Sequence, residues 1–179
     1  MAKVRIYRNL EQIGGGFGPC AITVGNFDGA HIGHREIFRR VAAVAREHGW
    51  KPSAMTFDPH PATVVAPDRA PHLLSTPDQR CRWMAESGIT QVVIVPFTSA
   101  FSYLSPEEFA AEVLVRRLDA RAVLIGANFR FGREKGGDAE RLRQLGAKLG
   151  FMTTVVPGIQ LRGRTVSSSE IRRLLAAGN

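Results

Sequence analysis

Two histidines, His31 and His34, lie three residues apart at the point where an apolar run gives way to a helical pattern. The apolar run covers residues 20–24 and predicts a buried strand, and the pattern after it predicts a helix over residues 34–48. Side chains three residues apart share one face of a helix, and the first helical turn offers free backbone N–H groups and a positive dipole end. This arrangement is typical of a site that contacts phosphate.

Three interpretations of the histidine pair can be compared with the surrounding residues. A zinc site needs further ligands, and no set of Cys, His, Asp or Glu stands at a matching spacing nearby, so no protein ligand for a metal is predicted. The histidines could also be structural and satisfied within the fold. Contact with phosphate is favoured, because Gly25 precedes the pair and Gly33 lies inside it, where a missing side chain lets a ligand approach the backbone.

Three consecutive serines, Ser167, Ser168 and Ser169, form a second candidate phosphate contact. Ser167 and Glu170 have the spacing of a capping box, which explains one serine as the start of a helix. The box leaves two hydroxyls and Arg172 unexplained, and the planar fork of an arginine suits phosphate oxygens. The segment is interpreted either as a helix start alone or as part of a triphosphate site.

Two further segments carry aromatic rings beside proline or glycine. Residues 56–61, Thr-Phe-Asp-Pro-His-Pro, place Phe57 near the end of a predicted strand. Residues 126–132, Gly-Ala-Asn-Phe-Arg-Phe-Gly, place an amide, two rings and a cation between glycines. The first segment can equally be a plain strand terminator. As a binding site, it would supply a rigid apolar wall for a flat ring.

No Ser-His-Asp or Cys-His arrangement is evident, so the sequence offers no activated side-chain nucleophile. A flavin or nucleotide monophosphate carries about 1.5 to 2 negative charges at pH 7 and is itself an ionised nucleophile. Its reaction needs alignment and neutralisation of charge, with Mg²⁺ screening a triphosphate. The candidate residues are consistent with phosphate transfer of this type.

Strand and helix patterns alternate along the chain. Strands are expected at residues 20–24, 52–57, 91–95, 122–125 and 151–156, and helices at 34–48, 76–88, 105–117, 138–149 and 167–176. Capping boxes at Thr76 and Ser105 open the second and third helices, and a long loop is expected between residues 58 and 75. This alternation predicts a doubly wound α/β fold with a mainly parallel sheet, whose ligand crevice is lined by the segments that follow the strands.

The composition is that of one globular domain. The 179 residues are 44% hydrophobic, and no run approaches the length of about 18 apolar residues that spans a membrane. The net charge of +8 favours anionic partners but does not separate nucleotides from nucleic acids. Cys20 and Cys81 stand in apolar surroundings, and the first six residues contain no apolar leader. Buried free thiols and a cytoplasmic location are therefore expected.

The four motifs at residues 25–34 (Gly-Asn-Phe-Asp-Gly-Ala-His-Ile-Gly-His), 56–61, 126–132 and 167–172 (Ser-Ser-Ser-Glu-Ile-Arg) resemble, in order and spacing, the FMN adenylyltransferase module of the bacterial bifunctional riboflavin kinase/FAD synthetase family. The histidine motif is shared with all nucleotidylyltransferases and class I aminoacyl-tRNA synthetases, whereas the second and third motifs are far more specific. The resemblance implies a Rossmann-like doubly wound sheet of the nucleotidylyltransferase superfamily. It also implies one FMN adenylyltransferase domain over residues 1–179 with no riboflavin kinase domain, which a longer parent chain could supply.

The resemblance further implies that the FMN phosphate attacks the α-phosphorus of ATP, giving FAD and pyrophosphate with Mg²⁺, and that His31 and His34 are catalytic. ATP contacts are implied for Gly25, Asn26, Phe27, Asp28, His31, Gly33, His34, Ser167, Ser168, Ser169 and Arg172. FMN contacts are implied for Phe57, Asp58, Pro59, His60, Pro61, Asn128, Phe129 and Arg130. ATP and FMN are thus the expected partners, and neither nucleic acid nor a membrane is expected.

Two other functions remain open at this point. An adenylyltransferase for another phosphorylated acceptor, such as phosphopantetheine, would use the same histidines but has less need of the rings in residues 57–61 and 128–131. A nucleotide-binding or nucleic-acid-binding module without catalysis would fit the net charge of +8, but the intact histidine pair argues against it.

Overall fold

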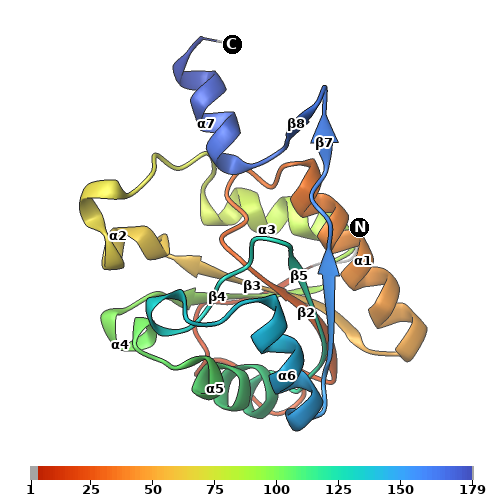
Figure 1. Cartoon of the computed structure of the whole chain (residues 1–179). Coiled ribbons are helices and arrows are strands. Elements are labelled where there is room, and N and C mark those ends of the chain that lie inside the picture. Colours follow the sequence, from red (N-terminus) through yellow and green to blue (C-terminus); the bar gives the residue numbers. More distant parts are fainter. Residues whose placement is uncertain (1–3, 179) are drawn as a thin grey trace.

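Six parallel strands form the central sheet of the computed structural model, which describes residues 4–178. They are β1 (Arg5–Tyr7), β2 (Cys20–Val24), β3 (Lys51–Asp58), β4 (Gln91–Pro96), β5 (Ala120–Gly126) and β6 (Met152–Val156), in the spatial order β1-β4-β3-β2-β5-β6. From β2 the chain adds β3 and β4 on one side and then returns to add β5 and β6 on the other (Figure 1). The predicted doubly wound, parallel α/β fold is confirmed.

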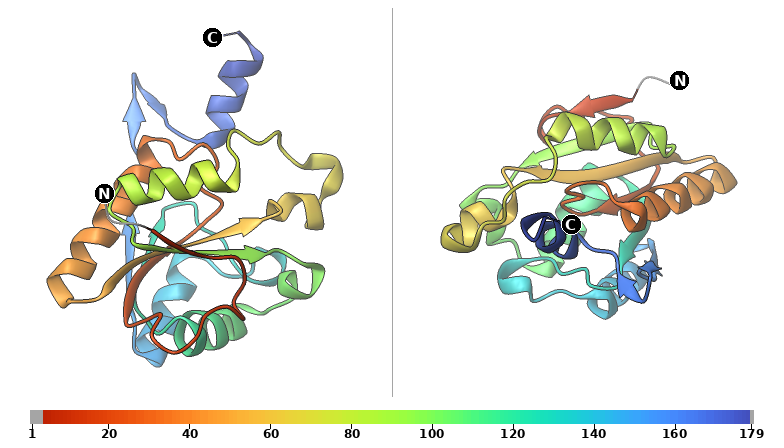
Figure 2. Two further views of the ribbon diagram at one scale, coloured as in Figure 1. Left: turned by 180° about the vertical axis from the view of Figure 1, so that it is seen from behind. Right: turned by 90° about the horizontal axis from the view of Figure 1, so that it is seen from above.

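Helices cover both faces of this sheet (Figure 2). On one face, α1 (Ile32–His48) and α3 (Pro77–Glu86) bury Phe38 and Met84 against the strands. On the other, α6 (Ala139–Leu149) and η2 (Phe109–Arg117), a π-helix that continues α5 (Pro106–Glu108), bury Leu114 and Leu142. The C-terminal α7 (Ser168–Ala176) has no buried residue along its described length and projects from the edge of the molecule (Figure 1).

The capping predictions are confirmed at two of three helices. Thr76 and Ser105 each form the complete box, in which the side chain of the third helical residue also returns to the backbone of the cap. Ser167 forms half a box: its hydroxyl accepts from the backbone N–H of Glu170 at 3.1 Å, but the carboxylate of Glu170 pairs with arginines instead. The prediction of a full box at Ser167 is therefore wrong.

Several elements differ from the sequence prediction. The expected loop between residues 58 and 75 contains α2 (Pro61–Val65) and the 3₁₀ turn η1 (Pro67–Arg69), which bury no side chain and so carry no apolar periodicity. The same reason explains why short elements escaped prediction: β1, α4 (Ser99–Ser102), η3 (Arg133–Lys135), and the hairpin of β7 (Gln160–Leu161) and β8 (Arg164–Thr165). The first helix begins at Ile32 rather than residue 34, because His31 is its N-cap.

Both cysteines are buried free thiols, as expected. Burial raises the pKa of Cys20 to about 12 and that of Cys81 to about 11, so neither is a thiolate at neutral pH. Within residues 4–178, none of the helices combines the length and the apolar character that crossing a bilayer requires. Residues 1–3 and 179 lie outside the described range. The ends of the predicted domain 1–179 therefore also lie outside it, as does half of the six-residue stretch in which no leader is expected.

Candidate active site

The two histidines meet at the start of α1, directly beyond the C-terminal end of β2. His31 caps the helix, because its Nδ1 accepts a hydrogen bond from the backbone N–H of His34 at 3.3 Å. The two rings stack with centroids 3.6 Å apart and an angle of 20° between their planes. Phe27 packs edge-on against His34 at 5.2 Å, which fixes the inner ring of the pair. The predicted sharing of one face is confirmed.

Both imidazoles are neutral at pH 7. Burial lowers the pKa of His31, and burial together with the neighbouring His31 lowers the pKa of His34 to about 3. A neutral ring carries one N–H, and Nδ1 of His31 is an acceptor, so its proton lies on Nε2. In the described part of the chain, Nδ1 of His34 is buried without a hydrogen-bond partner. The pair therefore offers N–H donors rather than positive charge.

Glycines at 25 and 33 make room for these rings. A Cβ atom on Gly25 would lie 2.9 Å from Cζ of Phe27, and one on Gly33 would lie 3.2 Å from Nδ1 of His31. A carbon at 2.9 Å from a ring atom is in steric overlap, so a side chain at position 25 would force the ring of Phe27 to shift.

Gly25→Ala is expected to lower the free energy of unfolding by about 1–3 kcal/mol, the cost of forcing an extra methyl group against a packed ring. Urea unfolding measures the change. Gly14→Ala is the matched control: a Cβ atom there has nothing within 4 Å, and its effect should stay within about 0.5 kcal/mol. Equal effects of the two substitutions would show that Phe27 does not crowd position 25.

Asp28 connects the histidine loop to two distant segments. Its carboxylate is 2% exposed and accepts hydrogen bonds from the backbone N–H of Leu74 at 3.0 Å, the backbone N–H of Ser75 at 2.9 Å and the hydroxyl of Ser75 at 2.9 Å. It also forms an ion pair with Nη2 of Arg172, whose Nε donates to the carbonyl of His72 at 2.7 Å. Residues 25–34, 72–75 and 167–172 are thus joined at one carboxylate.

The serines beside Arg172 have separate environments. Ser168 donates to the backbone carbonyl of Asp28 at 2.8 Å, and Ser167 caps α7. Ser169 is exposed. The two motifs predicted to contact phosphate, residues 25–34 and 167–172, therefore come together in space although about 140 residues separate them.

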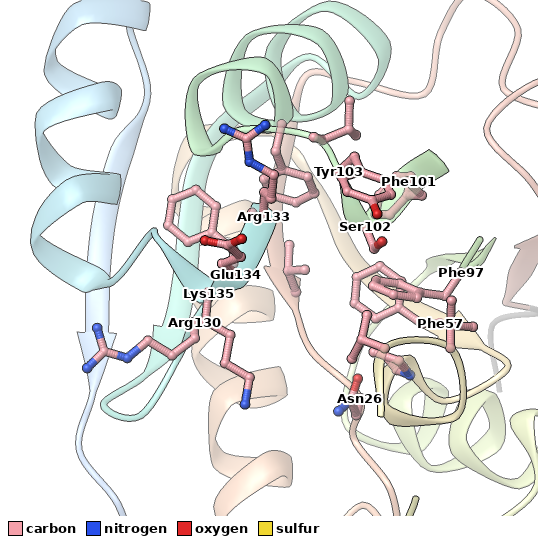
Figure 3. A pocket seen from close by; sticks show the side chains of 18 of the residues that line it. Asn26, Phe57, Phe97, Phe101, Ser102, Tyr103, Arg130, Arg133, Glu134 and Lys135 are labelled. Carbon is pink, nitrogen blue, oxygen red and sulfur yellow. The ribbon is translucent and has the colours of Figure 1, made fainter. Parts of the chain in front are cut away.

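A cavity of about 850 Å³ opens beyond the ends of β2, β3, β4 and β5. Seven residues of the predicted site line it: Gly25, Asn26, Phe57, Pro61, Asn128, Phe129 and Arg130. Figure 3 shows Phe57 and Phe97 across the cavity from Arg130 and Lys135. Phe57 packs edge-on against Phe97 at 5.4 Å, and Phe129 stacks on Phe131 at 5.5 Å. The walls are aromatic, with polar and charged groups at one side.

Three predicted FMN contacts lie beside this cavity rather than on its walls. Asp58 and Pro59 are exposed at the end of β3, and His60 caps α2. Nε2 of His60 lies 3.1 Å from Nδ2 of Asn26, which lines the cavity, so His60 contacts a cavity residue without lining the cavity itself.

Other cavity residues have no counterpart in the sequence prediction: Val64, Val65, Phe97, Ser99, Phe101, Ser102, Tyr103, Leu104, Arg133, Glu134 and Lys135. The segment from Phe97 to Leu104 follows β4, so the rule that ligand crevices form after parallel strands could have found it.

Arg80 is a further residue that the sequence did not mark, because an arginine in the helical pattern of α3 is expected at the surface. It is 3% exposed, and its Nη1 donates to the carbonyl of Asn26 at 2.8 Å and the hydroxyl of Thr56 at 3.0 Å.

Among the described residues, no three His, Cys, Asp or Glu side chains gather closely enough to hold a metal ion. Asp28, the buried carboxylate nearest in sequence to the histidines, is already occupied by its own partners. The donor set does not match a resident Mg²⁺ site, which takes carboxylate and other oxygen ligands.

Several known proteins are similar to this chain in sequence or in fold. A family model described as FAD synthetase matches residues 17–170. The bifunctional riboflavin kinase/FMN adenylyltransferase of Escherichia coli (strain K12) is 33% identical over 160 residues, which cover 89% of this chain and 51% of that protein. The protein of the same name from Pseudomonas fluorescens is 31% identical, covering 98% of this chain and 56% of the relative. A FAD synthetase of Listeria monocytogenes is 30% identical, covering 89% and 65%.

Two solved structures share the fold. One is titled a macrolide-efflux protein from Streptococcus pneumoniae, with a TM-score of 0.82 and 24% identity over 97% of this chain and 57% of that one. The other is a pantoate-beta-alanine ligase from Francisella tularensis, with a TM-score of 0.63 and 12% identity over 94% and 72%. Identities this low show that the fold is shared and support nothing about activity.

The chain spans about half the length of the first curated relatives it matches. The family model nevertheless covers most of its residues, from the loop before β2 to the first turn of α7, and includes all of the motifs except the last two residues of 167–172. The chain therefore belongs to the FAD synthetase family.

Proposed function

We propose that this chain transfers AMP from ATP to FMN, giving FAD and pyrophosphate. The observation that carries the proposal is the continuity of two sites. An aromatic cavity of about 850 Å³ and a pair of neutral histidines at a helix N-terminus are joined by the segment from Gly25 to Phe27. A flavin ring in the cavity and a triphosphate at the histidines would bring their phosphates together along that segment. Relatives named FMN adenylyltransferase and FAD synthetase support this choice.

In the proposed reaction, an oxygen of the FMN phosphate forms a bond to the α-phosphorus of ATP, and the bond from that phosphorus to the bridging oxygen breaks. Pyrophosphate leaves with the electron pair. The FMN phosphate is already ionised at pH 7, so no side chain needs to remove a proton. The protein's task is to align the phosphates and to neutralise charge.

His31 and His34 are the proposed catalytic residues. Nε2–H of His31 is free of the capping bond and is the donor proposed for the oxygens of the α-phosphate. A fixed N–H donor in a site that excludes water stabilises charge that develops in the transition state. The backbone N–H groups at the start of α1 would add to this effect. Phe27 and Asp28 are proposed to hold the histidine loop in shape, since both are buried.

Ser167, Ser169 and Arg172 are the residues proposed for the β- and γ-phosphates, with Ser168 attaching their segment to the loop of Asp28. A guanidinium has five N–H donors, and Arg172 uses Nε and Nη2 within the fold, which leaves Nη1 for a phosphate. Mg²⁺ is proposed to arrive with ATP as part of the substrate, held by phosphate oxygens and water. A riboflavin kinase, named in the bifunctional relatives, is the proposed source of FMN.

The assay that tests this proposal compares acceptors. The chain is incubated with ATP and Mg²⁺ and with either FMN or 4′-phosphopantetheine, and the products are separated by chromatography. FAD and pyrophosphate should form in equal amounts with FMN, and no dephospho-coenzyme A should form with the other acceptor. Formation of dephospho-coenzyme A without FAD would show that the acceptor is phosphopantetheine rather than FMN. Absence of product with both acceptors would show that the chain binds nucleotides without transferring AMP.

Phe129→Ala is expected to raise the KM for FMN about tenfold, because one ring stacked on a flat ligand contributes about 1.4 kcal/mol. The KM for ATP serves as the internal control and should stay near its wild-type value, since the histidines and α7 are proposed to bind that substrate. A rise in the KM for ATP alone would show that Phe129 contacts ATP rather than FMN.

A further inference from the structure

The side-chain amide of Asn26 sits at the wall of the cavity on a fixed backbone (Figure 3). The backbone carbonyl oxygen of Asn26 accepts from the hydroxyl of Thr56 at 3.1 Å and from Nη1 of Arg80 at 2.8 Å. Both donors are buried side chains. The remaining freedom of Asn26 lies in its side-chain amide, whose oxygen and nitrogen exchange places when the group rotates by half a turn.

His60 determines which of these two atoms faces it. Nδ1 of His60 accepts from the backbone N–H of Ala62 at 3.2 Å, as the N-cap of α2. A neutral imidazole has one N–H, so the proton of His60 lies on Nε2. Burial lowers the pKa of His60. The nearby positive charges of Arg172 and Arg80 lower this pKa further, whereas the negative charge of Asp28 raises it. His60 is therefore neutral at pH 7.

The structure places Nδ2 of Asn26 3.1 Å from Nε2 of His60. If Nε2 of His60 carries the proton, two N–H donors would face each other there, and rotating the Asn26 amide by half a turn supplies the missing acceptor. We propose that Asn26 turns its Oδ1 to His60 and its NH₂ group into the cavity, so that His60 is a positioning residue that presents Asn26 as a hydrogen-bond donor to a phosphate oxygen. This inference deepens the proposed function and rests on it for the identity of the ligand.

The location of Asn26 suits this role. Asn26 lines the cavity, and the next residue, Phe27, packs against His34 at 5.2 Å. A group at this junction lies where the phosphate of a flavin in the cavity would approach a triphosphate at the histidines. An amide N–H is complementary to a phosphate oxygen, whereas a carbonyl oxygen in the same position would repel it.

The tautomer of His60 tests the arrangement without any ligand. Long-range ¹H–¹⁵N correlation spectra of the histidine-labelled protein at pH 8 distinguish a protonated ring nitrogen from a bare one, and His60→Gln identifies the signals of His60. The expected result is a proton on Nε2 and a bare Nδ1. A proton on Nδ1 would overturn the inference, because Nε2 would then accept from Asn26.

Asn26→Asp tests the function of the donor. One carboxylate oxygen would accept from His60, and the other would face the cavity with negative charge in place of an N–H group. The kcat/KM for FMN is expected to fall about 100-fold or more, as when a fixed donor to a reacting anion is removed. Asn9→Asp is the matched control. It adds the same charge, and its Oδ1 caps a turn outside the cavity, a role that Asp also fills, so activity should be unchanged.

The two measurements separate this inference from the proposed function. A wild-type protein that makes no FAD would refute the proposed function, while the spectra would still decide the tautomer of His60. A wild-type protein that makes FAD, with Asn26→Asp within about threefold of it, would overturn the inference alone, since a carbonyl oxygen would then be what Asn26 presents to the ligand.

Discussion

His31→Ser is expected to lower the rate of FAD formation by a factor of about 100 to 1,000, while FMN still binds. The imidazole that is lost carries the outward Nε2–H proposed to contact the α-phosphate of ATP. FMN binding should survive because His31 does not line the aromatic cavity. Single-turnover production of FAD gives the rate, and quenching of flavin fluorescence gives the affinity for FMN.

His31→Ala provides the control that separates catalysis from capping. Serine keeps an oxygen that can accept from the backbone N–H of His34, and alanine does not, so alanine should cost about 1 kcal/mol more in unfolding free energy. Both variants should nevertheless be equally slow. Nearly wild-type turnover of the serine variant would show that His31 acts only as a helix cap. Loss of FMN binding in both variants would show that His31 belongs to the FMN site.

Arg172→Met is expected to lower the free energy of unfolding by about 3 kcal/mol, the lower end of the cost of leaving a buried charge without its partner. Asp28 is 2% exposed and keeps only its neutral donors, on Leu74 and Ser75, once the guanidinium is gone. The matched control is Arg173→Met. Arg173 is the next residue and pairs with Glu170 at the surface, so its loss should leave the urea midpoint nearly unchanged.

The same ion pair makes stability depend on acid pH. Burial alone would raise the pKa of Asp28, but hydrogen bonds from Leu74, Ser75 and Arg172 and the charge of Arg172 hold it below its usual value. The stabilisation from Asp28 is complete above the unfolded pKa of about 3.9 and is lost as the pH falls through the lower folded pKa. In Arg172→Met the acid transition should move to higher pH. An identical acid transition in both proteins would show that Arg172 does not stabilise the ionised form of Asp28.

Local signals in the sequence predicted the parts of the site that depend on neighbouring residues. The apolar run of β2, the turn at Gly25 and the spacing of His31 and His34 lie within 15 residues of each other, and together they predicted the strand, the helix and the shared face. The complete capping boxes at Thr76 and Ser105 were predicted for the same reason, since each needs only four consecutive residues.

Features that depend on tertiary packing were not predicted. The ion pair between Asp28 and Arg172 joins residues 144 positions apart, and no periodic pattern encodes it. Phe97 and Phe101 line the cavity because β4 lies beside β3 in the sheet. The spatial order of the strands has to be known before these two residues can be placed there. The carboxylate of Glu170 does not complete the box of Ser167 because Arg164 and Arg173 both bind it. Arg164 lies on the β7–β8 hairpin, whose exposed residues give no apolar pattern in the sequence.

The central claim is that an oxygen of the FMN phosphate becomes bonded to the α-phosphorus that ATP supplies, so that FMN provides the bridging oxygen of FAD. FMN labelled with ¹⁸O at the three non-bridging phosphate oxygens, incubated with unlabelled ATP and Mg²⁺, tests it directly by mass spectrometry. Attack by FMN retains all three labelled oxygens in FAD, one of them as the new bridge between the phosphorus atoms, and releases unlabelled pyrophosphate. FAD that has lost a labelled oxygen, or label in the pyrophosphate, would contradict the account.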